Sequence, residues 1–126
     1  MSVSAKKKMP SVQTKIFRMV IDMLIDTATN ADFIKEAINN YTDHIDSPTD
    51  DSGTTLLILA VKSERISVVD KLLLKCADMN KQDLDGNTPL HHAFMMGFQD
   101  VVHVLIQSGA DESIENREGR LPWELR

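Results

Sequence analysis

Three of the four histidines and the single cysteine of this sequence are candidate metal ligands: His91, His92, His103 and Cys76. Zinc needs three or four such ligands converging tetrahedrally, and they usually come in closely spaced pairs. The sequence holds no Cys-x-x-Cys and no His-x-x-x-His pair. The spacing therefore predicts no metal site, and we interpret His92 and His103 as partly exposed residues of helices.

Cys76 could act as a nucleophile if a histidine lay beside it. The apolar pattern before it, however, places Cys76 at the C-terminus of a helix, where the negative end of the helix dipole opposes thiolate formation. We expect no catalytic residue and no enzyme activity in this chain.

Paired aspartates suggest calcium, but Asp50-Asp51 and the pair Asp83 and Asp85 lack the spacing of an EF-hand loop. Asp85-Gly86 is a favoured pair for a tight turn, because glycine accepts positive φ. We interpret the aspartates as turn formers in connectors and expect no cofactor.

The connectors recur at a fixed distance. Gly53, Gly86 and Gly119 follow one another with a 33-residue period. Their neighbours keep the same spacing, as in the pairs Thr55 and Thr88, Leu57 and Leu90, Ala60 and Ala93, and Ala77 and Ala110. A fixed period of this length indicates stacked repeats, in which one unit alone cannot bury its apolar face.

Apolar periodicity predicts two short helices in each unit. In the two clear units they cover residues 54–62 and 66–75, then 89–96 and 99–108. Gly109 fits the left-handed position that ends the last of these helices.

The first unit is degenerate, since Val20 stands where the period would place glycine. A helix from Thr14 to Ile25 carries apolar residues over more than half of its circumference, which predicts burial on two sides. A second helix over 31–41 has Asn30 as its N-cap and one apolar stripe, formed by Phe33, Ile34, Ala37 and Ile38.

Charge is unevenly distributed along the 126 residues. The first 18 carry five lysines or arginines and no acid; since the whole chain is −5, residues 19–126 carry −10. An acidic body argues against nucleic acid as the ligand, because phosphate binding needs a basic face. We interpret residues 1–12, with the Lys6–Lys8 run, as a flexible basic leader, although such a run could also be a targeting signal.

Compartment and membrane association follow from composition. No apolar run is long enough to cross a bilayer, and the start lacks the features of a secretory signal. A single cysteine favours a reducing compartment. We expect a cytoplasmic protein, with the nucleus as an alternative location, that does not associate with membranes.

The stretch Thr88-Pro89-Leu90-His91-His92-Ala93 matches the hexapeptide Thr-Pro-Leu-His-x-Ala, and with the 33-residue period it resembles the ankyrin repeat. Residues 83–116 match throughout, and residues 50–82 match with departures at Leu56, Ile58, Glu64 and Cys76. Residues 117–126 match partly, with Leu121 in place of threonine. We expect Pro89 in the first helical turn, Thr88 as its cap, and His91 bonded to backbone groups of the adjacent connector.

The resemblance implies an all-α solenoid of stacked antiparallel helix pairs with β-turn fingers. Its units would be about 13–49, 50–82 and 83–116, with a partial unit at 117–126. It further implies protein binding through the fingers and the concave face. Mapped onto that geometry, the contact residues are Asp51, Thr54, Lys62, Leu84, Asp85, Asn87, Met95, Met96, Glu118 and Arg120.

Of these residues, Leu84, Met95 and Met96 are expected to form one apolar spot, suited to a partner surface. The resulting hypothesis is a non-catalytic adaptor or inhibitor that binds another protein, with a basic surface favoured in that partner. Two alternatives stay open. The chain could be part of a larger protein whose catalytic or channel activity lies elsewhere, or a structural module that self-associates weakly.

Overall fold

A computed structural model describes residues 12–26, 28–39 and 45–125 of the chain. Within these residues the regular structure is helical, with no strand. The elements are α2 (Val12–Ile25), α3 (Ala31–Asn39), α4 (Leu56–Lys62), α5 (Ile66–Leu74), α6 (Pro89–Met96), α7 (Gln99–Gln107) and the short 3₁₀ helix η1 (Pro122–Glu124). The predicted all-α fold is confirmed, and the helices of the two clear units lie within two residues of their predicted bounds.

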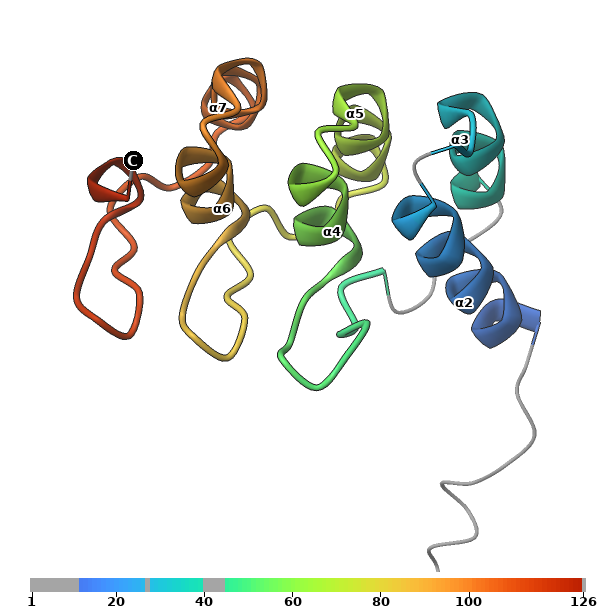
Figure 1. Cartoon of the computed structure of the whole chain (residues 1–126), viewed down its shortest axis with the longest axis horizontal. Helices are drawn as coiled ribbons and strands as arrows, with labels where there is room; N and C mark the ends of the chain where they lie inside the picture. Colours follow the sequence, from blue (N-terminus) through green and yellow to red (C-terminus); the bar gives the residue numbers. More distant parts are fainter. Residues whose placement is uncertain (1–11, 27, 40–44, 126) are drawn as a thin grey trace, which may run out of the picture.

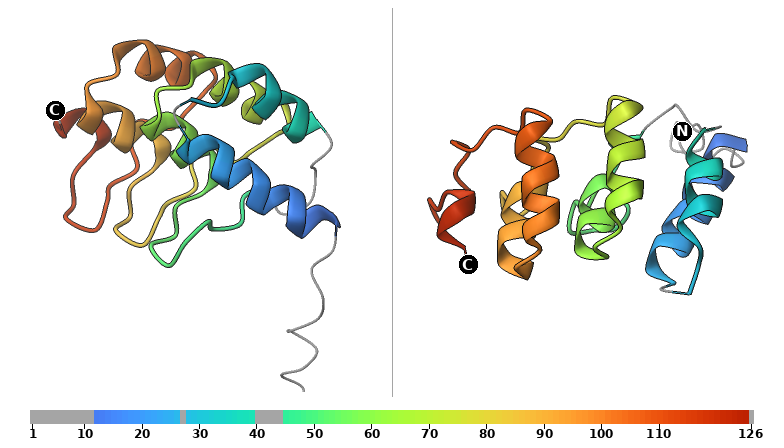
Figure 2. Two further views of the ribbon diagram at one scale, coloured as in Figure 1. Left: turned by 45° about the vertical axis from the view of Figure 1, so that its right-hand side comes forward. Right: turned by 90° about the horizontal axis from the view of Figure 1, so that it is seen from above.

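The helices form two layers. α2, α4, α6 and η1 pack side by side in one layer, and α3, α5 and α7 pack side by side in the other. Figure 1 shows the helix pairs in a row, with the connectors projecting from one side of it. Figure 2 shows α3, α5 and α7 aligned when the molecule is seen from above. This is the stacked arrangement that the sequence period predicts.

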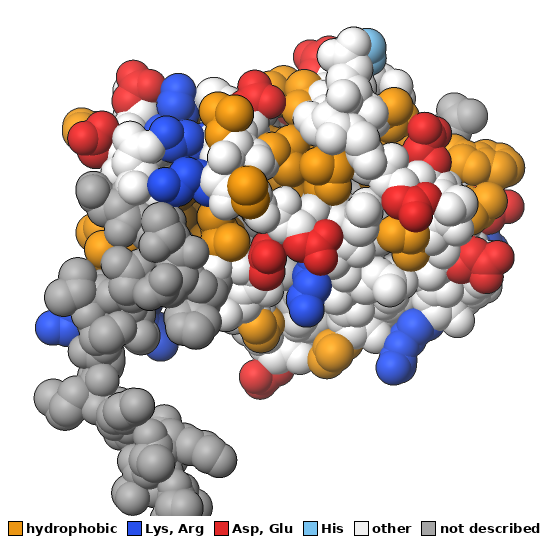
Figure 3. Space-filling model, turned by 180° about the vertical axis from the view of Figure 1, so that it is seen from behind, with side chains coloured by type: hydrophobic (Ala, Val, Ile, Leu, Met, Phe, Trp, Pro, Cys, Tyr) orange, Lys and Arg blue, Asp and Glu red, His pale blue; other side chains and the backbone are white. Residues whose placement is uncertain are grey.

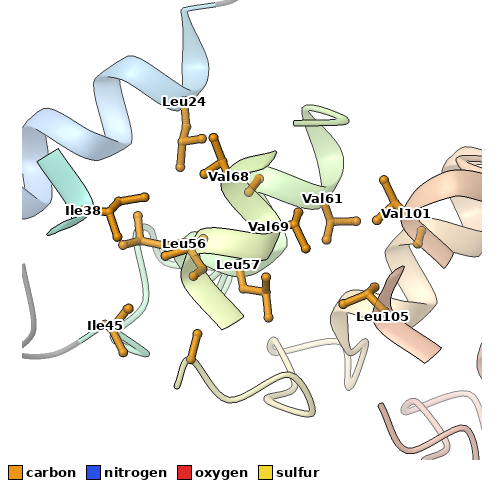
Figure 4. Packing of buried hydrophobic residues seen from close by; sticks show 14 of the residues in the cluster. Leu24, Ile38, Ile45, Leu56, Leu57, Val61, Val68, Val69, Val101 and Leu105 are labelled. Atoms are coloured by element: carbon orange, nitrogen blue, oxygen red, sulfur yellow. The ribbon is translucent and has the colours of Figure 1, made fainter. Parts of the chain in front are cut away.

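Aliphatic side chains fill the space between successive units. Leu57 and Leu90, which are equivalent in the repeat, are each 1% exposed, and Ala60 and Ala93 are fully buried. The small alanines allow neighbouring helices to approach closely. Figure 4 shows the second unit's Leu56, Leu57, Val61, Val68 and Val69 between Leu24 and Ile38 on one side and Val101 and Leu105 on the other.

Equivalent threonines begin the first helix of each clear unit. Thr55 and Thr88 have extended backbones, and their hydroxyls accept hydrogen bonds from the amides of Ile58 (3.2 Å) and His91 (3.3 Å). Pro89 occupies the first turn of α6, where its missing amide hydrogen has no effect on the helix. The predicted cap at Thr88 is confirmed.

The first unit is tied to the second through the loop between α4 and α5. Arg65 donates hydrogen bonds of 2.8 Å to the carbonyls of Asp26 and Thr29, and the Ser63 hydroxyl donates to the Leu24 carbonyl (3.2 Å). The C-terminal end of α2 is thereby held beside that of α4. Because α2 has 14 residues and α4 has 7, the N-terminal half of α2 extends to the level of the connectors (Figure 1).

Two apolar residues of the first unit are placed differently from the prediction. Phe33 is 66% exposed and does not share the buried stripe of Ile34, Ala37 and Ile38. Ile25 is 62% exposed at the end of α2. Phe33 lies about 100° around α3 from Ile34, and its exposure shows that neither α2 nor α5 covers most of it. The predicted basic leader, apart from Val12, lies outside the described residues.

Candidate protein-binding surface

Three connectors of the same design project from the stack: the first finger (residues 48–54), the second finger (81–87) and the third finger (114–120). In each, one side-chain oxygen accepts hydrogen bonds from two backbone amides further along the turn. Asp50 accepts from residues 52 and 54 (3.0 and 3.3 Å), Asp83 from 85 and 87 (3.0 Å each), and Asn116 from 118 and 120 (2.9 and 3.0 Å). Asp50 and Asp83 are therefore turn formers, as predicted. Asn116 was not predicted from the sequence, although it occupies the same repeat position as Asp83.

Neighbouring fingers are joined by backbone hydrogen bonds. The Leu84 amide donates to the Ser52 carbonyl (2.9 Å), and the Arg117 amide donates to the Asp85 carbonyl (3.0 Å). Gly86 lies in this contact with φ +81°, and a Cβ atom added there would stand 2.7 Å from the Arg117 backbone nitrogen. The fingers are thus fixed relative to one another before any partner binds.

His91 connects α6 to the third finger. Its Nδ1 accepts a hydrogen bond from the Thr88 amide (3.0 Å), so in the neutral ring the proton is on Nε2. Nε2 lies 3.0 Å from the Arg120 carbonyl oxygen, to which it donates. The predicted structural role of His91 is confirmed.

His92 is buried, and the prediction that it is partly exposed is wrong. Its Nε2 lies 2.8 Å from Oδ2 of Asp83, the carboxylate that closes the second finger. Burial lowers the pKa of His92, and the hydrogen bond to Asp83 opposes this effect only in part. The sequence offered a signal for this pairing, because Asp83 is a turn residue in the same repeat unit as His92. His103, by contrast, is exposed as predicted.

The apolar residues predicted for the contact surface are all exposed: Leu84 by 60%, Met95 by 44% and Met96 by 46%. Leu84 belongs to the second finger and the methionines to the last turn of α6. Since the eight residues of α6 rise about 12 Å, these side chains are two separate apolar groups near opposite ends of the helix. The prediction of a single apolar spot is corrected accordingly.

The polar residues of the predicted set divide into two groups. Thr54 and Asn87 are 4% and 9% exposed, which contradicts a place on the contact surface. The Thr54 hydroxyl lies 3.0 Å from that of Ser52 within the first finger, and the Asn87 side chain accepts a hydrogen bond from Asn116 (3.0 Å), which joins the second finger to the third. The remaining members are exposed, namely Asp51, Lys62, Asp85, Glu118 and Arg120.

In the view of Figure 3, a group of basic side chains lies at the upper left, and acidic and hydrophobic side chains are interspersed over the rest of the molecule. Across the described part of the chain, no three His, Cys, Asp or Glu residues are grouped so as to hold a metal ion. Cys76 is exposed and has a left-handed backbone, with φ +66°. No helix within the described ranges is long and apolar enough to span a membrane.

The profile of the family "Ankyrin repeats (3 copies)" matches residues 23–116, about three quarters of the chain. The chain belongs to the ankyrin-repeat family. Ankyrin repeats are non-catalytic units that mediate protein–protein interaction, so the fingers and the first-helix layer are the surface of interest in this chain.

Similar proteins include the human 2-5A-dependent ribonuclease, 36% identical over 88 residues, which are 64% of this chain and 12% of that protein. The chicken nuclear factor NF-kappa-B p105 subunit is 44% identical over 68 residues (53% of this chain and 7% of that protein). The mouse protein phosphatase 1 regulatory subunit 27 is 39% identical over 74 residues (59% and 48%). The chain therefore spans less than half of the length of these relatives.

Proposed function

We propose that this chain binds a partner protein through its fingers and the exposed side of α4 and α6, acting as an adaptor or an inhibitor without catalysis. The observation that carries the proposal is the exposure of Leu84, Met95 and Met96 on elements that the fold holds rigidly. Large apolar side chains gain free energy when a partner removes them from water, at about 25 cal/mol per Å². Methionine also adapts its shape to the surface that covers it.

The spacing of these groups limits the shape of the partner. The partner must contact the second finger and the last turn of α6, which are about one helix length apart (roughly 12 Å). An extended segment or a helix laid across α6 fulfils this requirement. Contact along α6 would also cover Lys62, which is exposed and is the equivalent of Met95 in the second unit.

Charge favours a partner with a basic surface. Asp51, Asp85 and Glu118 are exposed on successive fingers, and complementary charge speeds encounter and selects among partners. The names of two relatives, a phosphatase regulatory subunit and a nuclear factor subunit, support a regulatory role by similarity. We extend the proposal to a cytoplasmic or nuclear location and to a chain that is monomeric or self-associates weakly.

Affinity capture with the full chain tests the proposal when it is compared with the variant Leu84→Ala, Met95→Ala, Met96→Ala. Phe33→Ala is the matched control, because it removes an equally exposed apolar side chain from α3, in the other layer. We expect partners captured by the wild type and by Phe33→Ala to be lost by the triple variant. Circular dichroism must show unchanged helix content in both variants.

A recovered partner would then be measured by calorimetry at two salt concentrations. Binding that weakens with salt supports the acidic fingers as part of the contact. Capture that is equal for the wild type and the triple variant would reject this surface. Light scattering measures the mass of the free chain in solution. The alternative that the chain self-associates requires a mass well above that of one chain.

A further inference from the structure

A groove of about 410 Å³ opens between α5 and α7, in the layer of second helices. Its lining is mainly apolar and includes Leu73, Leu74 and Met79, with Asp70 and Ser108 at its edges. Leu74 is 78% exposed, more than any other large hydrophobic side chain in the described part of the chain. We call this feature the α5–α7 groove. It is formed by the layer of second helices, whereas the surface described above is formed by the first helices and the fingers.

One repeat position beside the groove is occupied by residues of different length. Lys75 and Ser108 are equivalent in the repeat and follow the ends of α5 and α7. Between α3 and α5, Lys75 reaches back and its Nζ donates a hydrogen bond of 3.2 Å to the Asn39 carbonyl. Ser108 is too short to bridge from α7 to α5 in the same way. The lysine bridge between α3 and α5 therefore has no counterpart from Ser108 between α5 and α7.

Three aspartates lie in or beside the groove, together with two lysines at the C-terminal end of α5, Lys71 and Lys75. Asp70 stands at its wall, and Asp78 directly precedes Met79. Asp111 lies close by, since its amide donates to the Asn80 side chain (2.9 Å). The C-terminal ends of α5 and α7, which carry partial negative charge, meet here as well. Lys71 is the basic residue in the last turn of α5, and α7 has none there.

We propose that the α5–α7 groove binds a short segment of another protein that carries a bulky apolar side chain next to a lysine or arginine. The apolar side chain contacts Leu73, Leu74 and Met79, and the cationic group pairs with Asp70. An anionic surface, such as an acidic membrane or a nucleic acid, is disfavoured by the three aspartates. A chain that uses both layers holds two partners at once, which distinguishes an adaptor from an inhibitor.

Selection from a phage library of random dodecapeptides on the immobilised full chain tests this proposal. We expect enriched peptides to share an apolar residue beside lysine or arginine. A synthetic peptide of the consensus sequence is then titrated against variants by fluorescence polarisation. Ser108→Lys, which copies the bridge made by Lys75, and Asp70→Lys, which reverses the charge, should each raise the dissociation constant by about tenfold or more.

Two controls make the result specific. Gln99→Lys introduces the same side chain at an exposed position in the first turn of α7, nine residues from Ser108, and should leave the dissociation constant within about twofold of the wild type. The variant Leu84→Ala, Met95→Ala, Met96→Ala should also bind the peptide normally. The test is thus independent of the function proposed above, and failure of either proposal can be recognised separately.

Absence of enriched peptides, enrichment of acidic ones, or equal binding by Ser108→Lys and Asp70→Lys would each overturn the proposal. Should Ser108→Lys alter the fold, as judged by circular dichroism, Leu74→Gln takes its place. It gives α5 the residue that Gln107 provides at the same position of α7. Retained peptide affinity in a folded Leu74→Gln variant would likewise overturn the groove assignment.

Discussion

The second unit (residues 50–82) and the third unit (83–116) share one backbone but are stabilised by different chemistry. In the third unit, His91 and His92 bond to backbone and carboxylate groups of two fingers. In the second unit, Ile58 and Leu59 occupy these positions, and Ile58 is fully buried. The same site in the stack therefore accepts either a hydrogen-bonded ring or an aliphatic side chain.

The equivalent turn aspartates of the two fingers, Asp50 and Asp83, have different additional hydrogen-bond partners. Asp83 uses its second carboxylate oxygen for His92, whereas the equivalent carboxylate of Asp50 accepts a hydrogen bond of 2.7 Å from the Ser52 hydroxyl. This bond is the largest of the causes that lower the pKa of Asp50. The period thus preserves backbone geometry, while side-chain partners can be exchanged as long as every buried polar group is satisfied.

Truncating the equivalent residues should have the largest effect on stability. Ile58→Ala is expected to lower the free energy of unfolding by about 2–5 kcal/mol, because it leaves a cavity in the core. His91→Ala leaves the buried Thr88 amide without its partner, at about 1–3 kcal/mol, whereas the Arg120 carbonyl keeps the hydrogen bond from the Asn116 amide (2.9 Å). Urea denaturation followed by circular dichroism measures both.

Replacing His91 by the isoleucine of the second unit separates the contribution of packing from that of hydrogen bonding. His91→Ile should destabilise the chain less than His91→Ala, because it fills the volume and copies the second unit. If His91→Ile and His91→Ala are equally destabilised, hydrogen bonding rather than packing dominates the third unit.

Gly86 should tolerate substitution less well than Gly119, although their φ angles are +81° and +77°. Alanine at either position incurs the strain of a left-handed backbone, about 1–2 kcal/mol. Only at Gly86 would the added carbon also meet backbone atoms of the next finger; a carbon added at Gly119 would have no such neighbour within 4 Å among the described residues. We therefore expect Gly86→Ala to reduce the thermal midpoint more than Gly119→Ala. Equal reductions would show that the fingers separate at little cost.

Register alone predicted the parts of this molecule that repeat. The helix bounds, the cap at Thr88 and the equivalence of Gly53, Gly86 and Gly119 follow from a 33-residue period and local turn chemistry. Features that depend on one particular neighbour were not predicted. His92 is buried because Asp83 faces it, and this pairing involves residues at different positions within the unit.

The end unit was harder to predict for a related reason. An amphipathic pattern gives the positions that are apolar but not the number of neighbours that a helix has. Phe33 is apolar like Ile34, yet among the described helices the main neighbours of α3 are α2 and α5, and Phe33 stays 66% exposed beside them. Among the contact residues, exposure of Leu84, Met95 and Met96 was foreseen, whereas the burial of Thr54 and Asn87 depends on contacts within and between the fingers.

The His92–Asp83 pair should make the third unit sensitive to pH. Since burial lowers the pKa of His92 below 6.5 in the folded chain, the unfolded chain binds the proton more readily. The stability that comes from the neutral ring is therefore present above about pH 6.5 and is lost as the pH falls from there toward the folded pKa. The charged or titratable groups that act on the ring through their charge are Asp83, Lys62 and His91.

His92→Leu copies Leu59 of the second unit and removes this titration. We expect the thermal midpoint of the wild type to fall between pH 7.5 and 5.5 more steeply than that of His92→Leu. Asp50 and Asp111 do not interfere, since hydrogen bonds from Ser52 and Ser113 lower their pKa below 3.8. Parallel pH profiles for the two proteins would show that the ring is not held neutral by burial.

The smallest effect is expected where the two units differ in their left-handed turns. Between the paired helices the second unit has Glu64 (φ +55°) where the third has Gly97 (φ +73°), and after the second helix it has Cys76 (φ +66°) where the third has Gly109 (φ +102°). A side chain in this region costs about 1 kcal/mol relative to glycine. Glu64→Gly and Cys76→Gly should therefore each raise the free energy of unfolding, by up to about 1 kcal/mol, although glycine's greater freedom in the unfolded chain offsets part of the gain. Since Glu64 and Cys76 are both exposed, neither change removes core packing, and the sign of the effect shows whether relief of backbone strain exceeds the entropic cost of glycine in the unfolded chain. Destabilisation by both substitutions would mean that this cost, together with any stabilising contacts of the two side chains, is larger than their backbone strain.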